Sequence, residues 1–286
     1  MKTIITIIIS TLIGLAVAWA GGQGGTMLGA TSLFFACGVL AFLINWAVYI
    51  PANIFKTEKY YDLTGSITYL SVTSYAVFMS PGLDLRGKIV AILVVVWALR
   101  LGSFLFARII RDGKDSRFDK IKINPLRFLV AWTLQGLWVV LTAACALAVI
   151  TSANRVPLDM FAYTGLAVWV IGFAFEAISD QQKKAFKSDP ANKGKFISTG
   201  LWAWSRHPNY FGEITLWLGI AIIAVPVLSG WQWVTLISPV FVTVLLTRIS
   251  GIPMLEDRAD KEWGNDPAYQ AYKENTPTLI PSPPKG

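Results

Sequence analysis

The sequence predicts an all-α integral membrane protein, a polytopic bundle of about eight transmembrane helices. Two observations predict it. Of the 286 residues, 54% are hydrophobic and 15% are charged, whereas about a quarter of the residues in an ordinary soluble domain are charged. The apolar residues also fall into runs of about 20, the length that a helix needs to cross the hydrocarbon. These runs lie at 3–20, 28–50, 64–80, 88–109, 126–150, 159–178, 210–229 and 231–250.

The distribution of basic residues predicts the orientation, because lysine and arginine favour cytoplasmic loops. With eight spans, one side of the membrane receives both termini and the segments 51–63, 110–125 and 179–209, which carry most of the cations. The loops on the opposite side hold only Arg86, Lys88 and Arg155. We therefore expect both termini in the cytoplasm.

The first run, 3–20, has two interpretations. Lys2, the apolar stretch and Ala18-Trp19-Ala20 fit a cleaved signal peptide, but the apolar part is long for a signal core, which favours a retained span. No segment is large and polar enough to form a separate soluble domain. We expect one membrane domain over residues 1–286.

Composition excludes several classes of site. The net charge of +8 indicates topology and contact with lipid headgroups rather than nucleic acid, since no nucleic-acid module is visible. Cys37 and Cys145 fall inside predicted spans, so a disulfide framework is not expected. His207 is the single histidine, and with no cluster of cysteine and histidine we expect no metal site.

A charged loop follows the fourth predicted span. It runs from Arg111 to Asp119 and mixes both signs around Gly113. One interpretation is a solvated basic loop that faces the membrane surface. The other is a cationic clamp for phosphate groups, in which Lys114 and Arg117 would bind phosphate oxygens.

Two pairs of polar residues, one of them acidic, lie at the ends of predicted helices. Glu176 and Asp180 share one face of the sixth helix near its cytoplasmic mouth, and because like charges repel, the pair favours a hydrogen-bond donor such as a ribose hydroxyl or a carboxamide. Pro208 suits the first turn of the next helix. There Asn209 and Glu213 lie one turn apart, where free N–H groups favour a phosphate or an acidic headgroup.

Other polar residues lie at or near membrane depth. Arg100 is isolated in the fourth span, so it marks either a functional site or a structural pair, for example with Glu176 or Glu213. Tyr61 and Asp62 precede the third span. They are either interfacial belt residues or an acid, with Asp62 raised in pKa by desolvation, that donates a hydrogen bond to a substrate carbonyl.

These residues together resemble one family. The sequence resembles the steroid 5α-reductase superfamily, most closely its bacterial branch of DUF1295-like membrane proteins, from about residue 96 to 281. The resemblance rests on four motifs: Trp97-x-x-Arg100, Arg111-Asp-Gly-Lys114-Asp-x-Arg117, Glu176-x-x-x-Asp180-Gln181, and Ser205-Arg-His-Pro-Asn-Tyr-Phe-Gly-Glu213.

The resemblance implies about seven family helices, with one extra at the N-terminus and a reductase-like core over about 60–286. It also implies NADPH in a cavity that faces the cytoplasm from a bacterial inner membrane. Tyr269 and Tyr272 in the tail would close over the adenine end. The other residues implied at the cofactor are Arg100, Lys114, Arg117, Glu176, Asp180, Lys195, Arg206, His207, Asn209 and Glu213.

The activity implied by the resemblance is hydride transfer to a carbon–carbon double bond conjugated to the carbonyl of a steroid-like or other lipid. An acidic side chain that hydrogen-bonds the carbonyl stabilises the developing enolate. The family's Gln-Glu pair and its tyrosine are not reproduced here. Trp97 stands where the tyrosine is expected, and Asp62 is an approximate counterpart of the carboxylate. With Tyr61, these form the predicted catalytic set.

Two other classes of function stay open. Membrane methyltransferases that use S-adenosylmethionine, acting on isoprenylcysteine or phospholipids, also carry an Arg-His-Pro segment and an acidic tail, here Glu256-Asp257. They lack the Glu-x-x-x-Asp-Gln motif, which favours NADPH. A non-catalytic lipid-binding protein could use the same bundle. The sequence leaves the lipid partner and the oligomeric state open.

Overall fold

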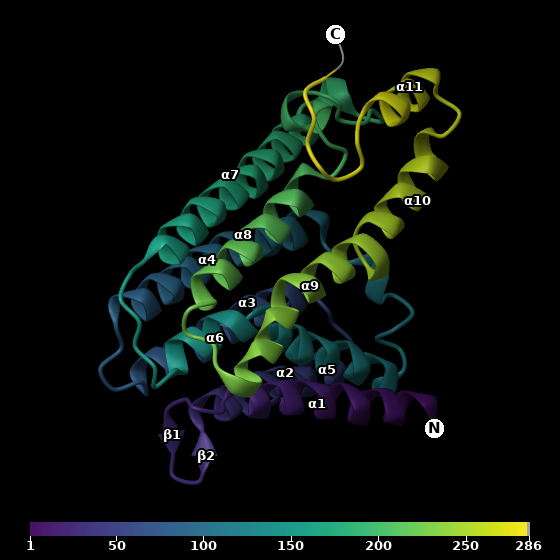
Figure 1. Ribbon diagram of the computed structural model, residues 1–286. Helices are drawn as coiled ribbons and strands as arrows, with labels where there is room; N and C mark the ends of the chain where they lie inside the picture. Colours follow the sequence, from purple (N-terminus) through teal and green to yellow (C-terminus); the bar gives the residue numbers. More distant parts are fainter. Residues whose placement is uncertain (285–286) are drawn as a thin grey trace. The chain divides into compact units, whose positions relative to one another are not determined.

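A computed structural model describes residues 1–284 and confirms the all-helical class (Figure 1). A two-stranded hairpin, β1 and β2, is the only sheet among these residues. The elements are α1 (Lys2–Gly21), β1 (Met27–Leu28), β2 (Thr31–Ser32), α2 (Leu33–Ile54), α3 (Tyr61–Phe78), α4 (Leu85–Asp112), η1 (Ser116–Phe118), α5 (Pro125–Thr142), α6 (Ala144–Thr151), α7 (Met160–Ser188), η2 (Pro190–Asn192), η3 (Gly200–Ala203), α8 (Pro208–Ala224), η4 (Gly230–Leu236), α9 (Ile237–Val244), the π-helix η5 (Leu245–Ile249), α10 (Ile252–Trp263) and α11 (Pro267–Asn275).

The chain divides into two compact units. The first contains Met1–Ala162 and Ile223–Ser238, and the second contains Tyr163–Ile222 with the residues from Pro239 onward. The predicted cofactor residues are divided between them, with Arg100 and the loop of Lys114 in the first unit and the others in the second.

Most of the predicted spans are long apolar helices. Within residues 1–284, six segments are long and apolar enough to cross a membrane: Lys2–Gly21, Leu33–Ile54, Leu85–Arg111, Pro125–Thr142, Met160–Ser188 and Gly230–Trp263. The predicted runs 64–80 and 210–229 are also helical, as α3 and α8, but α3 is rich in threonine and serine and α8 has 17 residues. The count of eight spans and the cytoplasmic termini stay predictions.

In the first unit, small residues let helix α1 pack closely against α2 and α5 (Figure 1). A Cβ atom at Gly14 would lie 2.7 Å from the Cζ of Phe42, and one at Gly38 would lie 2.7 Å from the Cβ of Ala18. Small residues at such contacts are how helices approach closely in membranes. Helix α1 is therefore an integral part of this unit.

Arg86 holds the start of α4 to two other segments of the first unit. Its side chain is fully buried, and its guanidinium donates to the carbonyls of Val156 (3.2 Å), Pro157 (2.7 Å) and Ile223 (2.7 Å). It also donates to Asp159 Oδ1 at 2.7 Å. A buried guanidinium is tolerated because its donors are satisfied in this way.

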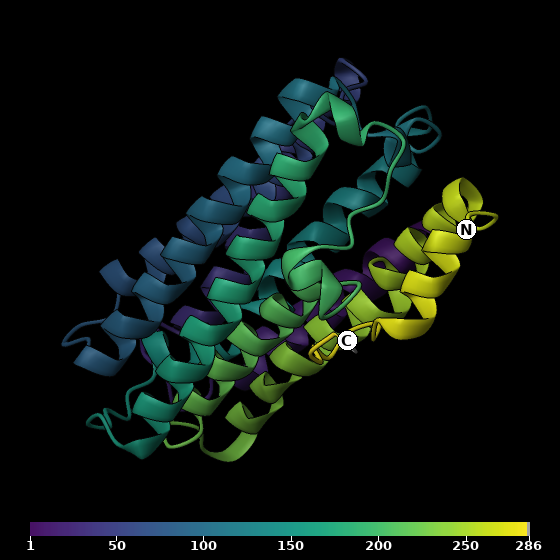
Figure 2. The same cartoon turned by 90° about the horizontal axis from the view of Figure 1, so that it is seen from above.

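In the second unit, α7 and α8 lie side by side in both views (Figures 1 and 2). Their backbones touch at glycines: a Cβ at Gly172 would lie 2.4 Å from Leu216 N, and one at Gly212 would lie 2.4 Å from Glu176 N. Helix α7 continues ten residues beyond the predicted end at 178, because the segment after Asp180 is rich in helix-forming Gln, Lys and Ala.

Candidate cofactor site

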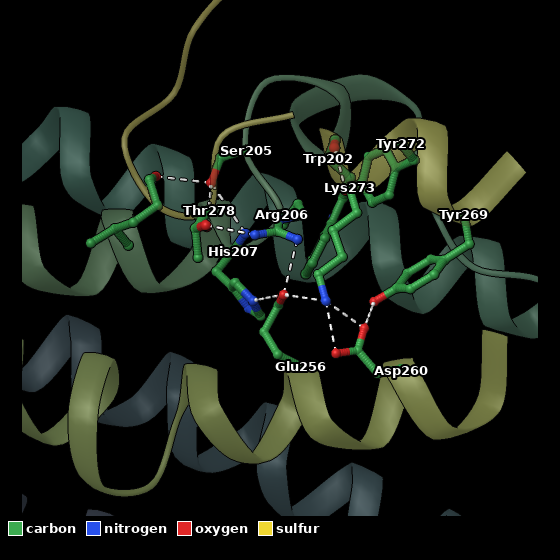
Figure 3. A network of polar contacts seen from close by, with 11 residues as sticks. Trp202, Ser205, Arg206, His207, Glu256, Asp260, Tyr269, Tyr272, Lys273 and Thr278 are labelled. Carbon is green, nitrogen blue, oxygen red and sulfur yellow. Dashed lines mark hydrogen bonds and ion pairs between the residues drawn. The ribbon is translucent and has the colours of Figure 1, made fainter. Parts of the chain in front are cut away.

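A network of polar side chains surrounds Glu256 of α10 in the second unit (Figure 3). Glu256 Oε1 lies 2.8 Å from His207 Nε2, and Oε2 lies 2.9 Å from Arg206 Nη1 and 3.9 Å from Lys273 Nζ. The π-helical turn Leu245–Ile249 and Gly251 precede α10. A Cβ at Gly251 would lie 2.4 Å from Leu246 O, so this break in the helix requires glycine.

Helix α11 joins the network through Lys273 and two tyrosines. Lys273 Nζ lies 2.6 and 2.7 Å from the two carboxylate oxygens of Asp260, which also accepts from the hydroxyl of Tyr269 at 3.3 Å. The hydroxyl of Tyr272 donates to Trp202 O at 2.7 Å. Both predicted tail tyrosines thus belong to this cluster. Burial, with Glu256 and Asp260 nearby, raises the pKa of Tyr269 to about 12, so it stays a hydrogen-bond donor.

A strap of residues 276–282 runs beside the segment 204–206. Arg206 N donates to Pro277 O at 2.9 Å, and Arg206 Nη2 donates to Thr278 Oγ1 at 2.6 Å. Ser205 Oγ donates to Leu279 O at 2.8 Å. No sequence pattern predicts this strap, because most of its hydrogen bonds use backbone atoms.

Two residues of the network, Arg206 and His207, each have a buried hydrogen-bonding atom that could bind a ligand. Burial lowers the pKa of His207, and its hydrogen bond to Glu256 only partly opposes this, so the ring is neutral at pH 7. If Nε2 carries the proton and donates to Glu256, Nδ1 is an acceptor. Among the described residues, neither His207 Nδ1 nor Arg206 Nε, both buried, has a hydrogen-bond partner. A buried polar atom is normally bonded, so these atoms point to a bound group.

The end of α7 and the start of α8 meet at Asp180 and Asn209, two of the residues predicted at the cofactor. Asn209 Nδ2 donates to Asp180 Oδ1 at 3.2 Å, and Asp180 is buried. Helix η3 docks beside them, since Trp202 Nε1 donates to Ser179 O at 3.0 Å and Lys183 Nζ lies 4.4 Å from the centre of the Trp202 ring.

The remaining predicted residues of the second unit are placed as follows. Glu176 is buried on α7, one turn before Asp180, and Glu213 follows Asn209 by one turn on α8. Lys195 is exposed in the segment between η2 and η3. Gln181, part of the quoted motif, is exposed, whereas its neighbour Gln182 accepts a hydrogen bond from Leu201 N at 2.9 Å.

In the first unit, the predicted phosphate clamp binds its own carboxylates. Lys114 Nζ lies 3.1 Å from Asp119 Oδ2, and Arg117 Nε lies 2.9 and 3.0 Å from the oxygens of Asp115. The buried carboxylate of Glu58 accepts from the backbone N–H of Asp115 at 3.0 Å, and from Lys122 Nζ at 2.6 Å. Burial raises the pKa of Glu58, but these two hydrogen bonds outweigh it and the pKa lies below its usual value.

The predicted catalytic residues are not all adjacent. Tyr61 donates its hydroxyl to Ala131 O at 3.0 Å, and Asp62 forms an ion pair with Arg108 at 3.1 Å. Trp97 packs edge-on against Tyr69, with ring centres 5.0 Å apart. Tyr69 lies eight residues beyond Tyr61 on α3, which places Trp97 roughly 12 Å along that helix from Tyr61. Arg100 lies on α4, with its guanidinium 5.7 Å from the ring centre of Phe104.

Several residues of these clusters were not predicted: Glu58, Arg108, Glu256 as the centre of a network, Asp260 and Lys273. Arg108 offered a signal, because it is a further cation near the end of the apolar run of the fourth span. Glu58 and Asp260 offered none, since each lies in a segment of mixed charge where most side chains are exposed.

Comparison with known proteins gives a family and two relatives. The family described as "Protein of unknown function (DUF1295)" matches residues 48–276. The chain is 30% identical over 116 residues to the "Probable O-methyltransferase ustE" of Ustilaginoidea virens. The aligned region covers 35% of this chain and 40% of that protein. It is 23% identical over 226 residues to an uncharacterised protein of Schizosaccharomyces pombe, covering 68% of this chain and 66% of that protein. The chain thus spans about two fifths of the first relative and just under two thirds of the second. No solved structure matches the chain.

Proposed function

The chain belongs to the DUF1295 family of proteins of unknown function, and from this premise we propose that it is a membrane-embedded, NADPH-dependent reductase. It transfers hydride to a carbonyl-conjugated carbon–carbon double bond of a lipid. The observation that carries the proposal is the pair of unpartnered buried atoms, Arg206 Nε and His207 Nδ1, beside Asn209 in sequence.

The residues of the second unit fit the groups of a dinucleotide. Arg206 and Lys183 are cations suited to phosphate oxygens, and Arg206 Nε has a free donor. His207 Nδ1 accepts hydrogen bonds, as a ribose hydroxyl requires. Asp180 and Asn209 supply further acceptors and donors for a sugar or a carboxamide. NADPH, when bound, would supply the hydride.

The other residues of the network orient these groups. Glu256 accepts a hydrogen bond from Nε2 of His207, which leaves Nδ1 of the same ring to face the ligand. Thr278 and Glu256 both hold the Arg206 guanidinium. The side chains that would recognise the cofactor are thus preorganised, which reduces the entropy lost on binding.

For the lipid, Asp62 and Tyr61 stay the proposed catalytic residues with Trp97. The Arg108 guanidinium reaches from α4 to Asp62 at the start of α3 and supplies a second polar group there. A hydrogen-bond donor there would stabilise the negative charge that develops on the substrate carbonyl. Because Tyr61 already donates to Ala131 O, we assign the larger effect to Asp62 in its protonated form, which can donate and which burial favours by raising the pKa of this carboxyl.

A methyltransferase that uses S-adenosylmethionine is the second candidate, and the relative named as a probable O-methyltransferase favours it. That cofactor also carries a ribose, which His207 would bind, but it has no phosphate. A non-catalytic lipid-binding protein is the third.

A cofactor titration separates the three candidates. We expect the purified protein in detergent to bind NADPH with micromolar affinity and to bind S-adenosylmethionine at least tenfold more weakly. Binding of S-adenosylmethionine alone would defeat the reductase, and binding of neither would leave the lipid-binding protein. Measurement by isothermal titration calorimetry requires no substrate.

Two substitutions test where the cofactor binds. Asp180→Ala and Asn209→Ala should each weaken NADPH binding by about tenfold or more, since each removes a partner of a buried hydrogen bond. The matched control is Gln181→Ala, because Gln181 follows Asp180 on the same helix but is exposed. Equal affinity in all three variants would show that the cofactor site is elsewhere.

A further inference from the structure

A charged segment between α4 and α5 is fastened to the start of α3 by one buried carboxylate of the first unit. The segment covers residues 113–124 and contains the short helix η1. Glu58 lies between α2 and α3 and is 3% exposed. Its Oε1 accepts from the backbone N–H of Asp115 at 3.0 Å, and its Oε2 accepts from Lys122 Nζ at 2.6 Å. One side chain therefore holds the segment near both of its ends.

Other charged contacts of the segment are internal to it. Lys114 Nζ lies 3.1 Å from Asp119 Oδ2, and Lys122 Nζ lies 3.9 Å from Asp119 Oδ1. Arg117 Nε lies 2.9 Å from Asp115 Oδ2. Because these pairs join residues of the same segment, they are kept when the segment moves as one piece.

Both ends of the segment can turn without breaking a helix. Gly113 ends α4 with a φ of +80°, a conformation that glycine adopts freely, and a Cβ there would meet no described atom within 4 Å. At the other end Pro125 begins α5, and the side chain of Asn124 caps this helix by accepting from Arg127 N at 3.1 Å. The two helices are thus terminated independently of the segment between them.

Phe118 inserts from the segment into an aromatic cluster of the first unit. It is 6% exposed, and its ring centre lies 4.8 Å from that of Tyr61 and 6.2 Å from that of Phe128. Tyr61 is one of the residues proposed for catalysis. Phe118 therefore covers part of its ring.

The segment also lies close to Asp62. Burial raises the pKa of Asp62, and the charge of Arg117 is the strongest effect that opposes this rise, ahead of that of Arg108. Arg108 is itself an ion-pair partner of Asp62 at 3.1 Å. Arg117 is therefore also near this carboxylate, which places the segment over both proposed catalytic residues at the start of α3.

We propose that residues 113–124 form a lid over Tyr61 and Asp62, with Glu58 as its latch and Phe118 as its plug. Opening breaks the two hydrogen bonds to Glu58, whose carboxylate the departing segment leaves open to water. The ion pairs inside the segment and the helices on either side are kept. Opening is therefore a local event with a smaller free energy than unfolding of the bundle.

An open lid uncovers an aromatic recess beside a carboxylate. The place that the Phe118 ring vacates is bordered by the rings of Tyr61 and Phe128. Such a recess suits an apolar ring or chain of a lipid, with Asp62 beside it for a polar group. The lid adds regulation of access to the proposed function, and it rests on that function only for the catalytic role of Tyr61 and Asp62. Its movement requires neither cofactor nor substrate.

Cleavage by chymotrypsin after Phe118 tests the lid, because the protease must bind the ring that the closed segment buries. The purified protein in detergent is digested, and the rate of cleavage at this bond is measured by peptide mass spectrometry. Hydrogen exchange of the amides of α3 and α5 is followed in parallel. We expect cleavage after Phe118 while both helices stay protected. Cleavage that begins only when these amides exchange would overturn the proposal.

Two substitutions release the latch. Glu58→Gln removes the charge that holds Lys122, and Lys122→Gln removes the cation and keeps Glu58. Each should speed cleavage after Phe118 by about tenfold or more, the effect of one hydrogen bond to a charged group. Lys114→Gln is the matched control, because the pair of Lys114 and Asp119 is inside the segment, and the rate should not change.

The Lys122→Gln protein decides if Glu58→Gln fails to fold. A rate of cleavage that neither variant raises would refute the latch. An equal rise in Lys114→Gln would refute it as well, because loss of any charge would then loosen the segment.

Carboxyl labelling tests whether the lid covers Asp62. A water-soluble carbodiimide with glycine ethyl ester should label Asp62 several-fold faster in Lys122→Gln than in the wild type. The exposed Asp266 of the second unit is the internal control and should be labelled equally in both proteins. Equal labelling of Asp62 in both proteins would show that the segment moves without uncovering it, and would overturn the lid.

These measurements separate the lid from the proposed function. A lid that opens as expected in a protein that does not bind NADPH would refute the reductase and keep the lid. Binding of NADPH by a protein whose cleavage after Phe118 is unaffected by Lys122→Gln would refute the lid and keep the reductase.

Discussion

Replacing Gly212 with alanine should push helix α8 away from helix α7 and so separate Asn209 from Asp180. The added Cβ would lie 2.4 Å from Glu176 N and 2.5 Å from Gly172 O, whereas ordinary contacts begin at 3.4 Å. Both obstacles are backbone atoms, so the helix must move by about 1 Å. The bond between Asn209 and Asp180, now 3.2 Å, would lengthen to about 4 Å and be lost.

The expected effects are a loss of stability of about 1–3 kcal/mol from overpacking and a loss of NADPH affinity of about tenfold. The assays are thermal unfolding in detergent and the calorimetric titration. Leu218→Ala on α8 is the control, because Leu218 is 45% exposed and its removal should change neither quantity. A Gly212→Ala protein with unchanged stability and affinity would refute the close helix contact and its role in the site.

Three other parts of the structure give further predictions. Arg86→Met should lower the free energy of unfolding by about 3 kcal/mol or more, because three carbonyls lose their donor. Lys88 is exposed, so Lys88→Met should leave this free energy unchanged. Chemical denaturation of both variants measures the difference. Gly14→Val should lower the melting temperature, because its side chain would overlap Phe42, and unaltered melting would indicate that α1 is not packed here. NADPH affinity should fall as the pH drops through the pKa of His207 in the folded protein, which burial places below 6.5, because the ring then accepts a proton and Nδ1 no longer accepts a hydrogen bond. A titration from pH 8 to 5 on the wild type and His207→Gln tests this, and a drop of the same size in His207→Gln would contradict it.

The pH prediction has a second consequence for stability. The folded protein lowers the pKa of His207 below the value of 6.5 that it has when unfolded. Between these two values the unfolded chain binds the proton and the folded chain does not, so stability rises with pH. The contribution of His207 is therefore fully present above about 6.5 and decreases as the pH falls toward the folded pKa.

Much of the fold could be predicted because apolar length alone identifies membrane helices. Hydropathy could not place the break at Ala143, which divides the run 126–150 into α5 and α6, because the sequence stays apolar on both sides of it. Hydropathy also could not predict where α7 ends, because a helix that leaves the membrane becomes polar without becoming less helical. The π-helical turn before Gly251 has no local signal apart from the glycine.

Spacing along a helix predicts which residues share a turn, such as Glu176 and Asp180, but it cannot predict contacts in which the tertiary structure joins distant segments. The motifs named Asp180 and Asn209 as cofactor residues, and the structure joins them by a hydrogen bond, while their role at a cofactor stays a prediction. The role of Glu256 depends on Arg206, His207 and Lys273, which no spacing rule relates to it. For Lys114 and Arg117, charge predicted a phosphate clamp, but nearby carboxylates compete for the same cations.

The central claim is that the second unit holds the cofactor, and photoaffinity labelling tests it most directly. Illumination of the protein with 2-azidoadenine NADP, followed by peptide mapping, should label residues within 193–213 or 254–282, and excess NADPH should prevent the labelling. Labelling confined to residues 1–162, or labelling that NADPH does not prevent, would contradict the account.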